Sequence, residues 1–312
     1  HVHYAGGKLG TMASLSGIRP LVVTVMGGDV QPEQHPGGLS VLERRATRRL
    51  LHAADLILAK SDGLRAEVAA LGDFAPKVET IRWGVDPAVF HPRPEAARAL
   101  RSRLGLPPEA RVLLSPRILR PLYNVHLIVE ALPRVLAAVP EAVLVVVEHR
   151  ADPEYKKSLV AQVESLRLGD RVRFIGVCDH AEMPALYSLA EVMISIPFSD
   201  GLPQSLFEAM ACETPSILGR LAGYAEVVTD GTHVLLVDLR PEALADAVVL
   251  LLKDRSRACA LAAAARERVR EVAWLPAEAK RVEGLYQRLL ERPRRRASLS
   301  GRVLDALSLF VR

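Results

Sequence analysis

Cysteine is scarce in this sequence, and it has no long apolar run. The 312 residues include three cysteines, far apart, which follow neither a disulfide nor a metal spacing. We therefore expect them to be small buried residues in a protein of a reducing compartment. No apolar run approaches the ~18 residues that a membrane span requires, so we expect a protein that is soluble or peripheral to a membrane.

Excess positive charge is confined to one end of the chain. The formal net charge is +5, and residues 291–312 alone hold six arginines against two acidic residues. The remainder is nearly neutral, which argues against a broad nucleic-acid-binding surface. We expect no nucleic-acid partner, whereas the basic tail could touch anionic lipid or phosphate.

Short β-branched runs alternate with amphipathic stretches of helix length, which predicts βαβ units, parallel sheets and the α/β class. Half of the residues are hydrophobic, and single cores stop growing near ~250 to 300 residues, so two domains are expected. The predicted strands are 21–25, 56–59, 111–115, 142–148, 171–177, 191–196, 215–218 and 233–237. The predicted helices are 42–54, 125–139 (capped by Asn124), 241–253, 255–272 and one ending near residue 290.

The prolines of DPAVFHPRP (86–94) break regular structure and predict a linker. We expect an N-terminal domain at 1–94, a C-terminal domain at 95–272, a helix at 273–290 returning toward the first domain, and a basic tail at 291–312. The opening HVHYAGG resembles the end of a strand entering a turn. The N-terminal domain is therefore expected to be truncated, and the chain to be a fragment that transfers poorly unless extended upstream.

The stretch SDGLPQSLFEAMACETPS (199–216) follows a predicted strand and enters a predicted helix, where ligands bind in open parallel sheets. Gly201 would let an anion approach the backbone, and the Asp200 and Glu208 carboxylates could hold the hydroxyls of a sugar or ribose. Alternatively, Ser205 and Glu208 form a capping box and Asp200 is an ordinary turn residue. The stretch alone leaves both interpretations open.

A wider resemblance decides in favour of a ligand site. The stretch resembles the E-x7-E region of family 4 glycosyltransferases, and further segments resemble other parts of the same family. The resemblance runs in order from residue 1 to about residue 290. TVMGGDV (24–30) is similar to the family's T-x-H-G-x-D segment, and ADLILAKS and IRWGVDPAVFHP resemble its A-D-x5-S and N-G-V-D-x3-F-x-P segments. LLSPRILRPLYN resembles its G-R-x4-K-N loop, and RVRFIGV and GYAEVVTDGTHVLLV resemble its later strands.

This resemblance implies a retaining transferase with two facing Rossmann-like domains (GT-B type). It would move a hexose from a UDP- or GDP-sugar to a glycan, lipid or small-molecule acceptor, without metal or another cofactor. The chain contains no D-x-D pair, the usual magnesium-diphosphate ligand of the other large transferase fold. A cytoplasmic location, peripheral on the inner membrane face, is expected. Two alternatives are a nucleotide-sugar epimerase of the same fold and a catalytically impaired nucleotide-sugar-binding protein; the LFEAMACETP helix favours transfer.

The resemblance also implies roles for single residues. Arg117 and Asp200 would be catalytic, with Arg117 at the diphosphate and Asp200 near the donor sugar. The resemblance implies that four residues lie on the acceptor side: Gly6, Gly7, Met26 and Gly27. The remaining donor-binding residues would be Glu208 at the ribose, Gly201 and Leu202 at the diphosphate through their amides, and Val177 at the base through its backbone.

Four positions depart from the family pattern. Asp200 replaces a longer glutamate, and Met26 replaces a histidine that could donate to a sugar hydroxyl. The loop after Arg117 lacks the usual lysine, for which Arg120 is our expected substitute and Tyr123 the other candidate. Glu213 replaces a glycine, which costs roughly 1 to 2 kcal/mol if the backbone there is left-handed.

Four arginines, Arg44, Arg45, Arg48 and Arg49, recur at helical spacing on one face of the predicted helix 42–54, opposite Leu42 and Leu50. Most such runs are solvated faces. Together with the Arg294–Arg296 tail they are also candidates for peripheral contact with an anionic membrane.

Overall fold

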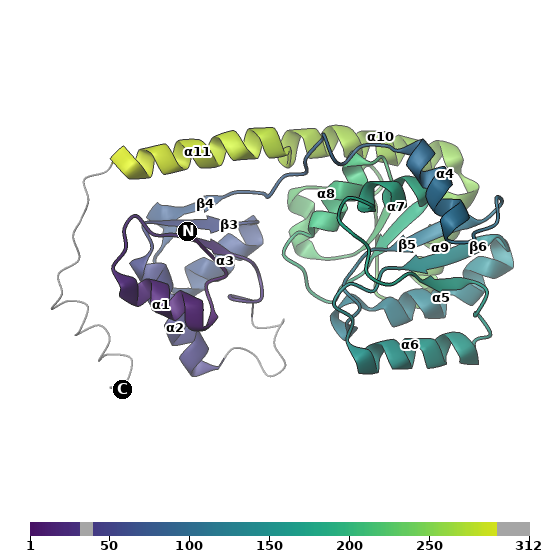
Figure 1. Ribbon diagram of the computed structural model, residues 1–312, viewed down its shortest axis with the longest axis horizontal. Helices are drawn as coiled ribbons and strands as arrows, with labels where there is room; N and C mark the ends of the chain where they lie inside the picture. Colours follow the sequence, from purple (N-terminus) through teal and green to yellow (C-terminus); the bar gives the residue numbers. More distant parts are fainter. Residues whose placement is uncertain (32–39, 292–312) are drawn as a thin grey trace. The chain divides into compact units, whose positions relative to one another are not determined.

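The computed structural model describes residues 1–31 and 40–291, which form two compact units (Figure 1). Among the described residues, unit 1 comprises those of 1–83 together with 276–291, and unit 2 comprises Gly84–Leu275. Each unit has a parallel sheet covered by helices, which confirms the predicted α/β class with two Rossmann-like domains. In the described part of the chain, none of the helices is both long enough and apolar enough to cross a membrane.

Unit 1 has four parallel strands in the order β1-β2-β3-β4. Every residue of β2 (VVTV) and β3 (LILA) is buried, as expected for strands covered on both faces. One face packs against α1, α2 and α3. The bounds are β1 (Val2–His3), α1 (Gly7–Ser16), β2 (Val22–Val25), α2 (Val41–Ala53), β3 (Leu56–Ala59), α3 (Asp62–Leu71) and β4 (Val78–Thr80).

The other face of this sheet is covered by a helix from the far end of the chain, α11 (Leu275–Glu291). Its Leu285 and Leu289 are buried against strand residues Val22, Leu56 and Leu58. Figure 1 shows α11, in yellow, beside β3 and β4 of unit 1. Unit 1 is therefore assembled from two separate parts of the sequence.

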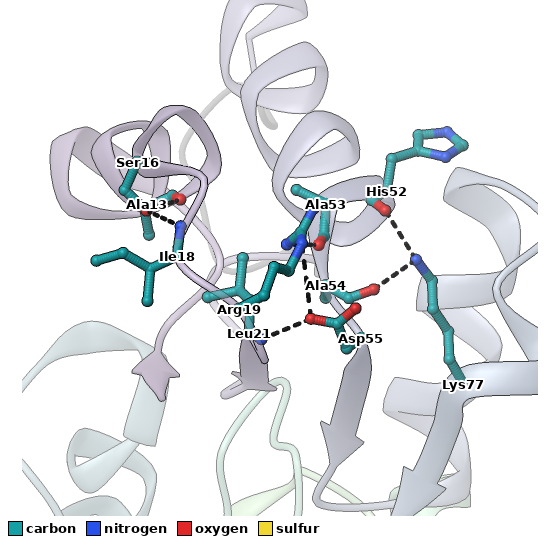
Figure 2. Close-up of polar contacts among 10 residues, drawn as sticks. All are labelled: Ala13, Ser16, Ile18, Arg19, Leu21, His52, Ala53, Ala54, Asp55 and Lys77. Atoms are coloured by element: carbon teal, nitrogen blue, oxygen red, sulfur yellow. Dashed lines mark hydrogen bonds and ion pairs between the residues drawn. The ribbon is translucent and has the colours of Figure 1, made fainter. Parts of the chain in front are cut away.

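A polar network closes the amino ends of β2 and β3 (Figure 2). The Asp55 carboxylate accepts a hydrogen bond from the amide of Leu21 at 2.7 Å and lies 3.7 Å from Arg19 Nε. Arg19 also donates to the carbonyl of Ala53, and Lys77 Nζ donates to two further carbonyls at the end of α2, at 2.9 and 3.0 Å. Carbonyls at a helix end lack partners within the helix, so these two cations satisfy them.

Unit 2 has six parallel strands in the order β10-β9-β8-β5-β6-β7, as many as the sequence predicted. One face packs against α4, α7, α8 and α10, and the other against α5, α6 and α9. The strands are β5 (Arg111–Ser115), β6 (Ala142–Val146), β7 (Val172–Phe174), β8 (Val192–Ser195), β9 (Ser216–Gly219) and β10 (Leu235–Val237). The helices are α4 (Pro94–Arg103), α5 (Val125–Ala138), α6 (Pro153–Ser165), α7 (Met183–Leu189), α8 (Gln204–Ala211), α9 (Pro241–Lys253) and α10 (Arg255–Val272).

The boundary between the units differs from the predicted linker at 86–94. This segment packs within unit 2, where Phe90 is buried and the Arg93 amide donates to Ser188 Oγ at 2.8 Å. The prolines interrupt regular structure without separating the domains. The unit boundaries lie instead at Gly84 and Leu275, against the expected 95 and 272.

The two ends of unit 2 lie against each other. The Val85 amide donates to the Ala273 carbonyl at 2.8 Å, and the Leu275 amide donates to the Val85 carbonyl at 3.1 Å. A Cβ added at Gly84 would lie 2.4 Å from the nitrogen of Leu275, so only glycine fits this crossing.

Two local expectations are corrected or completed by the structure. Asn124 precedes α5 but its side chain forms no capping bond; it donates to the Ile196 carbonyl at 2.9 Å and so ties the loop after β5 to the end of β8. Glu213 is left-handed, with φ 55°, and its carboxylate pairs with Arg266 of α10. Glu213, which stands where the family has glycine, therefore has a strained backbone and also forms a salt bridge.

Candidate functional site

The candidate site lies at the centre of the unit 2 sheet, where β5 and β8 are neighbours. The strand order reverses at this pair, and the carboxyl ends of strands at such a switch point are the usual ligand site of an open parallel sheet. Arg117 follows β5, Asp200 follows β8, and Glu208 lies on the next helix, α8. The fold therefore brings the main predicted donor residues to one edge of the sheet.

Arg117 lies in a buried polar network. Its Nη2 is 2.8 Å from Asp200 Oδ2, and the two side chains are only 10% and 11% exposed. Its Nη1 lies 3.5 Å from Ser195 Oγ and 3.4 Å from Ser205 Oγ. Burial acts to lower the pKa of Arg117, but Asp200 and nearby tyrosines outweigh it and raise the pKa, so the guanidinium stays charged.

Tyr123, and not Arg120, is the loop residue that contacts Arg117. The guanidinium carbon of Arg117 lies 4.5 Å from the centre of the Tyr123 ring, a cation–π contact. Arg120, our expected substitute for the family's lysine, is exposed. An aromatic ring thus adjoins the arginine where a second cation was expected.

Asp200 has three partners around its carboxylate. Besides Arg117, the Tyr224 hydroxyl donates to Oδ2 at 3.3 Å, and the Gly201 amide donates to Oδ1 at 2.8 Å. One of the two amides predicted to face a diphosphate is therefore bonded to Asp200. The other belongs to Leu202, which is buried and has a left-handed φ of 69°.

The predicted capping box at the start of α8 is not formed. The helix begins at Gln204 with Pro203 at the cap, and it has no side-chain capping bond. Ser205 is already inside the helix, so it cannot serve as the cap. The carboxylate of Glu208 is instead turned toward α7.

Glu208 is 7% exposed, and each of its carboxylate oxygens has a different neighbour. The Tyr187 hydroxyl donates to Oε2 at 2.8 Å, while Oε1 lies 3.7 Å from Nε2 of the exposed His180. Burial raises the pKa of Glu208, and Tyr187 and His180 oppose that rise. Oε2 is therefore engaged by the closer partner, and Oε1 faces an exposed histidine.

The loop predicted to border the base, at Gly176 and Val177, is anchored to Glu148 by hydrogen bonds. Gly176, with a left-handed φ of 73°, donates its amide to Glu148 Oε2 at 2.8 Å, and its carbonyl accepts from the Glu148 amide at 2.9 Å. Val177 follows with an exposed side chain. The backbone at Gly176, directly before Val177, is thus fixed by Glu148, which follows β6.

The four residues predicted on the acceptor side belong to two turns of unit 1 that Asp29 joins. Asp29 is 1% exposed, and it accepts hydrogen bonds from three backbone amides, those of Ala5 (2.6 Å), Met26 (2.9 Å) and Gly27 (2.9 Å). No role for Asp29 was evident from the sequence, and its carboxylate connects both turns. The four predicted residues are Gly6 and Gly7 at the start of α1, and Met26 and Gly27 after β2.

The basic face of α2 is only partly as expected. Arg44, Arg45 and Arg48 are exposed, and Arg49 is half-buried. Leu50 is buried, but Leu42 is 67% exposed and does not join the apolar face. The Arg294–Arg296 part of the predicted basic surface lies outside the described residues.

Two tyrosines of the site, Tyr187 and Tyr224, were missed by sequence reasoning. Each donates to one of the two predicted donor-binding carboxylates across a sequence separation of 21 or 24 residues. Their only local signal is an aromatic residue in an otherwise apolar segment, which ordinarily indicates core packing.

Within residues 1–31 and 40–291, no group of three His, Cys, Asp or Glu side chains could hold a metal ion. Metal independence stays a prediction.

Two Rossmann-like units, each on a parallel sheet, define the GT-B class of folds, and solved structures of that class share this architecture. The chain belongs to the family described as Glycosyl transferases group 1, whose sequence pattern matches residues 97–268, more than half of the chain. The matched region contains Arg117, Asp200 and Glu208.

Curated relatives agree with this family, and a solved structure shares the fold. The chain is 31% identical to a D-inositol 3-phosphate glycosyltransferase of Kineococcus radiotolerans over 73% of this chain and 56% of the relative. It is 29% identical to a GDP-mannose-dependent alpha-(1-6)-phosphatidylinositol monomannoside mannosyltransferase of Mycolicibacterium smegmatis, over 83% and 67%. The fold is similar to that of Anabaena HepE, solved with UDP and glucose: the TM-score is 0.80 at 22% identity, over 90% and 75%. The chain thus spans between about half and two thirds of the length of these curated relatives.

Proposed function

We propose that the protein is a retaining glycosyltransferase of family 4 that transfers a hexose from a UDP- or GDP-sugar to an acceptor. The observation that carries the proposal is the group of Arg117, Asp200 and Glu208 at the switch point of a family-matched sheet. A buried arginine suits a diphosphate, and two separate carboxylates suit the hydroxyls of a ribose and a sugar.

In this proposal Glu208 accepts from the ribose hydroxyls through Oε1, because Tyr187 already occupies Oε2. Arg117 and the Leu202 amide bind the diphosphate, and the guanidinium charge and the amide hydrogen bond stabilise the leaving group as the bond to the sugar breaks. Asp200 contacts the sugar, and the backbone of Val177, next to the anchored Gly176, borders the base. The site requires no metal for these contacts.

The names of the relatives support a polyol phosphate or an inositol lipid as the acceptor, since those proteins act on such molecules. For a lipid acceptor, the exposed arginines of α2 (Arg44, Arg45 and Arg48) would contact anionic headgroups at the cytoplasmic face of a membrane. Gly6, Gly7, Met26 and Gly27 would lie toward the acceptor.

The experiment is a calorimetric panel of UDP, GDP and ADP, each with and without its sugar and each with and without EDTA. Micromolar binding of one nucleotide, unchanged by EDTA, is expected. Turnover with inositol phosphate or a phosphatidylinositol vesicle, followed by NMR of the anomeric proton, then separates the candidate functions. A retained anomer on the acceptor supports the proposal, an inverted anomer refutes retention, and a free epimerised nucleotide sugar indicates the isomerase.

A further inference from the structure

The Asp200 carboxylate is shared between a cation and a phenol. Oδ2 lies 2.8 Å from Arg117 Nη2 and accepts from the Tyr224 hydroxyl at 3.3 Å. The Arg117–Asp200 pair is formally neutral. Asp200 is the nearest of the hydrogen-bonding partners of Arg117, since the hydroxyls of Ser205 and Ser195 lie at 3.4 and 3.5 Å. A diphosphate that approaches Arg117 therefore meets the carboxylate as a competitor of the same charge.

Tyr224 belongs to the core and not to the loop that carries Asp200. It lies on the short 3₁₀ helix η4 (Ala222–Glu226), is 1% exposed, and packs in the cluster beneath α8. The position of its hydroxyl is therefore set by core packing. The Asp200 loop, by contrast, turns through Gly201 and the left-handed Leu202.

We propose that Tyr224 is a positioning residue: its hydroxyl holds the Asp200 carboxylate when a donor diphosphate takes Arg117 from it, so that Asp200 meets the sugar. This inference rests on the proposed function. Burial and the Asp200 charge raise the pKa of Tyr224 well above its ordinary value, so the phenol remains a donor at physiological pH. Without that hydroxyl, the displaced carboxylate would lose its remaining side-chain partner.

The proposal separates binding of the sugar from binding of the diphosphate. Tyr224→Phe should leave the affinity for a nucleoside diphosphate within about twofold and weaken binding of the corresponding nucleotide sugar by about tenfold, the size of one charge-assisted hydrogen bond. A phenol that only fills space in the core would instead change both affinities equally.

The experiment titrates the unchanged chain, Tyr224→Phe, Asp200→Ala and the double variant with UDP, UDP-glucose, GDP and GDP-mannose by calorimetry. In the Asp200→Ala background, Tyr224→Phe should have less than a twofold effect, because no carboxylate remains to be positioned. If Asp200→Ala does not fold, Asp200→Asn replaces it, and the tyrosine effect should then fall below about threefold. Tyr155→Phe is the matched control, because the hydroxyl of this buried tyrosine bonds the His126 ring and not a carboxylate.

Equal losses for nucleotide and nucleotide sugar in Tyr224→Phe would overturn the inference and leave the proposed function intact. So would a tenfold loss that persists without the Asp200 carboxylate. If the unchanged chain binds none of the four ligands, both the inference and the proposed function are overturned.

Discussion

The neighbouring strands β5 and β8 carry an arginine–carboxylate pair at each end. At their amino ends Arg111 Nη2 lies 2.5 Å from Glu191, and these side chains are 33% and 36% exposed. At their carboxyl ends Arg117 and Asp200 lie 2.8 Å apart at 10% and 11% exposure. The two pairs have similar contacts, so contact distance alone does not distinguish a structural pair from a candidate site.

The surroundings of the two pairs differ. Arg111 also donates to the Leu252 carbonyl at 2.7 Å, which leaves it bonded to groups of the fold. Arg117 is bordered by serine and tyrosine hydroxyls and by the loop that enters α8. Backbone amides that precede a helix are available to an anion only at the carboxyl end of the sheet, and this explains why a ligand site is expected there.

The largest expected effect comes from removing Arg117, and removing Arg111 at the other end of the strands is the control. Arg117→Ala should weaken nucleoside diphosphate binding by about 3 kcal/mol, near a hundredfold, and leave nucleoside binding nearly unchanged. Arg111→Ala should leave both affinities unchanged, because its half-exposed pair serves the fold alone. Calorimetry on both variants makes the comparison, and equal losses for nucleoside and diphosphate would contradict the role of Arg117. If Arg117→Ala does not fold, because Asp200 is left unpaired, Arg117→Gln takes its place.

A second effect concerns Glu208. Glu208→Gln should weaken nucleotide binding by about 2 kcal/mol, because a charged acceptor is lost from the ribose. Glu191→Gln, a half-exposed glutamate at the opposite edge, is the control and should bind normally. Loss of stability without loss of binding would show that Glu208 has a purely structural role.

The pH dependence of the same residue has a defined sign. Burial raises the pKa of Glu208 above the ordinary value near 4.5, so the folded chain binds this proton more tightly than the unfolded chain. The free energy of unfolding therefore falls as the pH rises from 4.5 through the raised pKa, and Glu208→Gln should remove that fall. Nucleotide binding should be lost in the opposite direction, as the pH drops through the raised pKa. Denaturation and calorimetry across pH 4 to 8 test both signs.

A smaller effect is expected from a third arginine–carboxylate pair, Arg19–Asp55 of unit 1, which also lies at the amino ends of strands. Asp55→Asn should lower the free energy of unfolding by about 1 kcal/mol, because the pair is partly exposed and only its charge is removed. Nucleotide affinity should not change. A loss of affinity would show that amino-end pairs also contribute to ligand binding.

The smallest effect is expected at Glu213. Replacing it with glycine relieves a left-handed backbone, which is worth about 1 kcal/mol, and loses a partly exposed salt bridge with Arg266, which is worth about 0.5 kcal/mol. Glu213→Gly should therefore be more stable by about 0.5 kcal/mol, as measured by urea denaturation. A less stable variant would show that the salt bridge contributes more than the strain costs.

Strands and helices with strong periodicity were predictable from the sequence, and so was the edge of the sheet where the site lies. β5, β9 and α9 lie within one residue of their expected bounds, because apolar runs and helix periods are local signals. The partners of the site were not predictable. Tyr187 and Tyr224 meet the carboxylates only after strands far apart in sequence pair, and the prolines near Phe90 suggested a linker where tertiary packing holds the segment to unit 2.

The position of α11 determines the order in which the chain can complete its fold during synthesis. Unit 2 begins and ends at adjacent points, Gly84 and Leu275, so all of its residues are available once Leu275 has left the ribosome. Unit 1 starts earlier in the sequence than unit 2, but its sheet face that includes Val22 and Leu58 stays uncovered until Leu285 follows. A nascent chain with an uncovered apolar sheet is the kind of species that aggregates or engages chaperones. Of the two units, the one that starts earlier in this sequence is therefore the one whose core is closed last.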